Sequence, residues 1–172
     1  MSRQQKRFRV MRAVGCVIAI SSVLWPGQAG AGSDRTITGH FPIEEHYPVF
    51  EPESTVCGFP ISADLTGQGT FQAFLDADGN FLRGHVLLNI KGTLSGNGLT
   101  LRFGRSVNQF FELDGTVTEV GLVFRDSAPG VGVVLMDRGR LVFDSDGNLV
   151  FEAGPHPQLH GEFGELCEAL TP

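Results

Sequence analysis

The chain has 172 residues, of which 41% are hydrophobic, and 13 Lys and Arg residues against 19 Asp and Glu residues give a formal charge of −6. This length and apolar content suffice for one domain with a core of its own. An acidic surface repels the phosphates of nucleic acids and of anionic membranes. We therefore expect no nucleic-acid partner.

Residues 1–31 have the layout of a secretory signal peptide. Arg3, Lys6, Arg7, Arg9 and Arg12 form a basic opening without an acidic residue, and an uncharged run over 13–25 and a small-residue stretch ending at Ala31 follow. The uncharged run has 13 residues, whereas a membrane-spanning helix needs about 20. We predict cleavage after Ala31, a secreted location and no membrane anchor after cleavage; an uncleaved anchor is the alternative.

Cleavage changes the charge and the cysteine count. It removes five basic residues and no acidic one, which changes the formal charge from −6 to −11. It also removes Cys16 and leaves Cys57 and Cys167. An even number of cysteines in an oxidising compartment predicts a disulfide between them, with two free buried thiols as the alternative.

The remaining chain divides by composition and periodicity into an arm and a domain. Residues 32–56 combine three prolines with several glutamates and show no periodicity, which predicts an extended arm, in part disordered. Residues 57–172 consist of short alternating runs separated by glycine and aspartate. We predict that they form a single β domain.

Strands are predicted from a period of two. In Leu82–Gly92 the even positions are apolar or small and most odd positions are polar, as in a strand with one buried face. Residues 131–136 are nearly all apolar, which suits a strand buried on both faces. With Asp-Gly turns between the runs, the pattern predicts an all-β fold, an antiparallel barrel or sandwich of about eight to nine strands.

A short C-terminal helix completes the predicted fold. Leu159, Phe163, Leu166, Cys167 and Leu170 form one apolar stripe at helical spacing. The alternation from residue 57 to residue 64 suggests a first strand, at an edge of the sheet because a proline at position 60 cannot donate a ladder hydrogen bond. The disulfide would then join this first strand to the terminal helix.

No motif identifies a reaction. His156 and His160 have the spacing of two zinc ligands on a helix, but prolines flank His156 and the pair is only a weak candidate for a metal site. No Gly-x-Ser-x-Gly elbow or phosphate-binding loop occurs. The sequence therefore predicts no cofactor and no metal, and the catalytic residues, if any, are unknown.

Three segments resemble a family of small secreted bacterial proteins. These segments are Cys57–Pro60, residues 132–156 with the run Gly-Val-Val-Leu-Met-Asp-Arg-Gly-Arg, and Leu166–Leu170. The resemblance implies a secreted, β-rich domain with paired cysteines and no assigned activity.

The absence of a catalytic motif favours a non-catalytic binding module. Its ligand would be an apolar small molecule or a protein partner. A structural or interaction protein of the cell envelope is the first alternative, and a barrel-type isomerase or hydrolase is the second. Fold class alone does not separate them.

Overall fold

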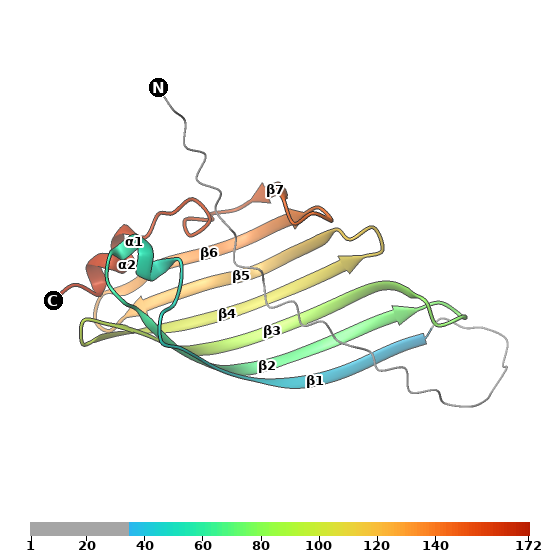
Figure 1. Ribbon diagram of the computed structural model, residues 1–172, viewed down its shortest axis with the longest axis horizontal. Helices are drawn as coiled ribbons and strands as arrows, with labels where there is room; N and C mark the ends of the chain where they lie inside the picture. Colours follow the sequence, from blue (N-terminus) through green and yellow to red (C-terminus); the bar gives the residue numbers. More distant parts are fainter. Residues whose placement is uncertain (1–34) are drawn as a thin grey trace, which may run out of the picture. The chain divides into compact units, whose positions relative to one another are not determined.

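The computed structural model describes residues 35–172, which form one seven-stranded antiparallel sheet and two short helices (Figure 1). The strands lie in sequence order, so each pairs with the next along the chain. The elements are β1 (Arg35–Tyr47), α1 (Glu53–Cys57), β2 (Ser62–Leu75), β3 (Phe81–Gly96), β4 (Leu99–Glu112), β5 (Val117–Ala128), β6 (Gly132–Phe143), β7 (Leu149–Ala153) and α2 (Gly164–Ala169). The predicted signal peptide, residues 1–31, lies outside the described residues.

The sheet confirms a mostly antiparallel β fold with a short C-terminal helix. Every strand pair is antiparallel. Within residues 35–172, β1 and β7 form the two edges and do not pair with each other. A closed barrel, a two-sheet sandwich and an eighth or ninth strand therefore stay predictions.

Strand β1 lies within the segment that was predicted to be an arm, so the β domain begins earlier in the chain than predicted. The segment is extended, as expected, but all 13 of its residues pair with β2. The sheet therefore begins at Arg35 and not at Cys57. Pro42 is tolerated because β1 is an edge strand, where a missing N–H need not break a ladder.

The two faces of the sheet differ in polarity. Ala63, Leu94 and Leu101 are cross-strand neighbours on β2, β3 and β4, and all three are buried. We call their side of the sheet the core face. Asp64 and Arg102, in the adjacent row of neighbours, are exposed on the opposite face. Side chains alternate between faces along a strand, so the register assigns every other residue to the core face.

Two paired glycines allow the backbones of neighbouring strands to approach closely. Gly121 on β5 and Gly139 on β6 are cross-strand partners with φ angles of 133° and 140°. A Cβ atom would lie 2.5 Å from the Ser106 carbonyl oxygen at the first position and 2.1 Å from the Ala153 carbonyl oxygen at the second. A side chain does not fit at either position, and glycine also adopts these positive φ angles without strain.

The helices lie together over one end of the core face (Figure 1). The buried apolar cluster comprises Phe50, Ile61, Ala63, Leu65, Leu94, Leu101, Phe103, Val134, Leu135, Phe163, Leu166 and Leu170. The 16 residues of β3 extend over about 50 Å at 3.3 Å per residue. The six residues of α2 extend over only about 9 Å at 1.5 Å per residue. Two such helices cannot cover the whole face.

Helix α1 is held by the hydroxyl of Ser54. This hydroxyl donates to the Phe50 carbonyl oxygen at 2.8 Å and accepts from the Ile61 N–H at 2.9 Å. Both bonds are buried, and they tie the helix to the segments before and after it. Gly58 then ends α1 in the left-handed conformation, with a φ of 76°.

The predicted disulfide is present, but it joins different elements. Cys57 is the last residue of α1 and Cys167 lies in α2, with their Cα atoms 5.2 Å apart. The bond therefore links two helices and not the first strand and a helix. Pro60 precedes β2, which lies between β1 and β3 and is not an edge strand.

Helix α2 is shorter than the predicted stripe. Phe163, Leu166 and Leu170 are buried, as the spacing predicts, but Leu159 is 37% exposed. Gly161 has a φ of 74°, which interrupts a helix before α2 begins.

Residues 131–136 were predicted to form a strand buried on both faces, but the start of β6 is partly exposed. Val134 and Leu135 are buried, whereas Val131 and Val133 are 76% and 41% exposed. The neighbouring strand β7 is short and pairs only with the far end of β6, from Arg140 onward. The start of β6 therefore lacks a neighbouring strand on its outer side within the described residues.

We expect the Cys57→Ser/Cys167→Ser variant to lose about 2–5 kcal/mol of unfolding free energy. The disulfide closes a loop across 110 residues, and its loss restores conformational entropy to the unfolded chain. Urea denaturation measures the difference. The reduced wild type should match the variant, and a variant as stable as the oxidised wild type would contradict this account.

Candidate functional site

Beyond the helices the core face continues as a second apolar area, which we call the distal core face. By register it comprises Ile37, Phe41, Ile43, Phe71, Ala73, Val86, Leu88, Phe111 and Val117. Ile37 is 46% exposed and the others are half-buried. In soluble proteins, contiguous apolar surface of this kind often marks an interaction or ligand site.

Two aromatic rings form a flat part of the distal core face. A Cβ atom on Gly39 would lie 2.2 Å from the ring of Phe71, and one on Gly69 would lie 2.1 Å from the ring of Phe41. Each ring therefore lies across the glycine opposite it on the neighbouring strand. The result is an apolar surface made of ring faces.

A small polar cluster lies on the same face. The Arg105 guanidinium is 3.4 Å from a Glu119 carboxylate oxygen, to which Gln109 also donates a hydrogen bond. The Arg105 and Glu119 side chains are only 22% and 13% exposed. The guanidinium also lies 5.7 Å from the Phe124 ring centroid, and the buried Arg105 Nε has no hydrogen-bond partner in the described structure. Apolar walls with a few placed polar groups are typical of small-molecule sites.

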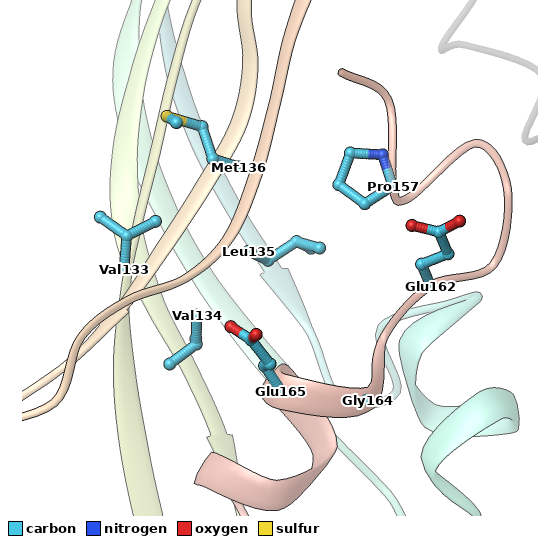
Figure 2. Close-up of a pocket in the computed structure, with 8 residues that line it drawn as sticks. All are labelled: Val133, Val134, Leu135, Met136, Pro157, Glu162, Gly164 and Glu165. Atoms are coloured by element: carbon cyan, nitrogen blue, oxygen red, sulfur yellow. The ribbon is translucent and has the colours of Figure 1, made fainter.

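A separate hollow, which we call the β6 groove, lies between β6 and the C-terminal segment (Figure 2). Its volume is about 430 Å³, and it is lined by Val133, Val134, Leu135, Met136, Pro157, Glu162, Gly164 and Glu165. One wall is the start of β6, and the other carries two carboxylates.

Two carboxyl groups are buried under the helices. Asp126 on β5 and Glu53 at the start of α1 are each 1% exposed. Gln158 donates a hydrogen bond of 2.8 Å to one oxygen of Glu53. The second oxygen of Glu53 and one oxygen of Asp126 have no partner among residues 35–172.

Burial raises the pKa of Asp126 to about 8, and the nearby Glu53 adds to the shift. Burial also raises the pKa of Glu53, although hydrogen bonds to its carboxylate, including that from Gln158, oppose this. Asp126 is therefore a neutral acid at neutral pH. Shifted carboxyl groups often mark active sites, but these two are closed to solvent and a substrate cannot reach them.

His156 and His160 belong to separate hydrogen-bond pairs. His156 is 2% exposed, and its Nδ1 is hydrogen-bonded to the buried Asp137. His160 is more exposed and is hydrogen-bonded to Glu152 at 2.7 Å. Burial raises the pKa of Asp137, and its hydrogen bond to His156 opposes this. In the part of the chain that the structure describes, no three His, Cys, Asp or Glu side chains are grouped as a metal site.

The structure assigns a structural role to His156. Its Nε2 lies 3.3 Å from the Ala153 carbonyl oxygen, so the ring connects Asp137 on β6 to the segment that follows β7. This contact fixes the direction in which the chain leaves the sheet. Sequence spacing identified the two histidines, but it did not identify Asp137 as the partner.

Within residues 35–172 no helix has the length and apolar composition needed to cross a membrane. In comparisons with known proteins, no family model, no curated protein and no solved structure matches the chain. The resemblance to small secreted bacterial proteins therefore stays a prediction.

We expect the stability of the domain to fall as the pH rises from about 4 to about 8. In this window the folded state holds a proton on Asp126 that the unfolded chain releases, so each rise in pH favours unfolding. Asp126→Asn should reduce this pH dependence. At pH 8 it should stabilise the domain by roughly the free energy that corresponds to the pKa shift of Asp126, a few kcal/mol. Urea denaturation across the pH range measures it.

Asp78→Asn, in an exposed turn, is the matched control and should leave the slope unchanged. An unaltered slope in the Asp126→Asn variant would show that the buried carboxyl does not control the pH dependence.

We expect His156→Ala to cost about 3 kcal/mol of unfolding free energy, because it leaves Asp137 buried without its partner. His160→Ala removes an exposed contact and should change stability by at most about 0.5 kcal/mol. Chemical denaturation of both variants compares them. Equal effects would contradict the structural role of His156.

Proposed function

We propose that this chain is a secreted, non-catalytic binding module for an apolar small molecule with a hydrogen-bond-accepting head group. The ligand would lie on the distal core face. The observation that carries the proposal is the large apolar area of a single sheet that the two helices leave uncovered.

The polar cluster suggests the chemistry of the head group. Arg105 pairs with Glu119 through a single contact of 3.4 Å, and its side chain is 22% exposed. A carboxylate, carbonyl or hydroxyl oxygen could accept a hydrogen bond from this guanidinium. The adjacent phenylalanines and aliphatic side chains would contact the apolar part of the ligand.

Secretion is part of the proposal. The signal-like residues 1–31 support it, and the Cys57–Cys167 disulfide fits an oxidising compartment. The enzyme alternative has weaker support, because the carboxyl groups with raised pKa values lie away from solvent. The cell-envelope alternative predicts no affinity for free amphiphiles.

The test is displacement of a fluorescent naphthalene sulfonate by fatty acids of increasing chain length. Each buried methylene contributes about 0.8 kcal/mol, so affinity should rise about fourfold per methylene while the chain stays within the site. Affinities that do not depend on chain length would contradict the proposal.

A pair of variants on β3 locates the site. Val86→Asn places an amide on the distal core face, whereas Leu87→Asn places the same group on the opposite face, and both residues are half-buried. We expect only Val86→Asn to weaken fatty-acid binding, by about tenfold. Equal loss in both variants would indicate a general effect on folding.

A further inference from the structure

The start of β6 is an open strand edge on its outer side. Strand β7 pairs with β6 only at Arg140–Phe143. One further backbone hydrogen bond follows, in which the Arg138 N–H donates to the Pro155 carbonyl oxygen at 3.0 Å. The chain then turns away toward α2. Among the described residues, no strand pairs with the outer side of residues 133–137.

The backbone of Met136 points toward this open side. In an antiparallel ladder the N–H and C=O of one residue point the same way, and alternate residues point in opposite directions. The Arg138 N–H points outward, and β6 contributes consecutive residues from Leu135 to Arg138 to its pairing with β5. The N–H and C=O of Met136, two residues before Arg138, therefore also point outward, away from β5.

The β6 groove lies beside this edge and has room for a ligand. Its volume of about 430 Å³ is within the usual range of about 300–1,000 Å³ for ligand sites. Val133 contributes an exposed apolar side chain at one end. Pro157 lies across the groove from Leu135 (Figure 2).

The groove is acidic. Glu162 and Glu165 are exposed and line the wall opposite β6, and Glu165 extends from α2 toward the strand (Figure 2). The chain after Ala31 has a formal charge of −11, since five of the 13 basic residues precede that point. A field of this sign attracts cationic partners.

We propose that the β6 groove binds an extended, basic peptide segment of a partner protein by strand addition. The peptide would continue the line of β7 along the edge of β6 and form backbone hydrogen bonds with Met136. Its lysine or arginine side chains would pair with Glu162 and Glu165. Backbone pairing provides affinity and side-chain contacts provide selectivity in this mode of recognition. This surface is separate from the distal core face, so the two ligands could bind independently.

The test uses a fluorescein-labelled hexapeptide of alternating lysine and valine, titrated with the full domain and followed by fluorescence anisotropy. The peptide should bind, and added salt should weaken binding. A hexapeptide of alternating glutamate and valine should not bind. Failure of the lysine peptide to bind, or equal binding of both peptides, would overturn the proposal.

Variants of Met136 separate strand addition from a general charge effect. Met136→Pro removes the outward N–H, and Met136→Ala keeps it. We expect Met136→Pro and the double variant Glu162→Gln/Glu165→Gln each to lower affinity by about tenfold or more, and Met136→Ala, which keeps the backbone N–H, to lower it clearly less than Met136→Pro. Equal binding by Met136→Pro and Met136→Ala would overturn strand addition.

Circular dichroism shows whether Met136→Pro folds. If it does not fold, hydrogen exchange of the wild-type domain tests the same backbone contact. The Met136 amide should gain protection when the lysine peptide is added. The Leu135 amide, which already faces β5, should not change. Protection that is unchanged at Met136 in the bound state would also overturn the proposal.

Discussion

The packing of α1 and α2 on one end of the core face is the contact on which the rest of the structure depends. A single sheet has two faces, and in this domain both helices lie on the same one. The apolar contacts of Phe163, Leu166 and Leu170 with the sheet, together with the disulfide between the helices, give the domain its core. The same contact limits what is covered, because the helices are far shorter than the strands. The distal core face is a direct consequence.

The helical end also contains the buried acids of the domain. Glu53 and Asp126 lie there with unsatisfied oxygens, and Asp137 is satisfied by His156. Buried carboxyl groups oppose folding when they are charged, so the domain gains stability when Asp126 is protonated. Many proteins behave in the opposite way, because their carboxylates are paired in the folded state and acid removes that stabilisation. Burial of Asp126 therefore gives the fold a pH response of this sign.

Sequence patterns predicted the strands whose alternation is regular. The even positions of residues 84–92 lie on the core face of β3, as their period of two indicates. They are less buried than that pattern suggests, because burial depends on the length of the covering helices and not on the strand. The sequence does not reveal strand β1, since Pro42 and the acidic residues that follow it obscure its alternation. Helix α1 has five residues, too few to show a helical period.

The candidate sites could be predicted only in part. The arginine at position 105 and the glutamate at position 119 lie on different strands, and irregularities in the pairing of β4 with β5 decide which face each occupies. The pairing of His156 with Asp137 depends on the path of the chain after β7. The open edge of β6 exists because β7 ends at Ala153 and the last backbone bond along this edge is the one from the Arg138 N–H to the Pro155 carbonyl oxygen.

Local patterns in the sequence predict most of the antiparallel strands, their turns, a Cys57–Cys167 disulfide and the apolar residues of the terminal helix. These features follow from local periodicity and from the two cysteines that lie beyond the predicted signal peptide, and they need no knowledge of distant contacts. Tertiary structure alone decided which elements the disulfide joins, which carboxyl groups are buried and which apolar residues stay uncovered. Those properties depend on strand register, on bulges and on the lengths of packed elements, and none of these is encoded in a short stretch of residues.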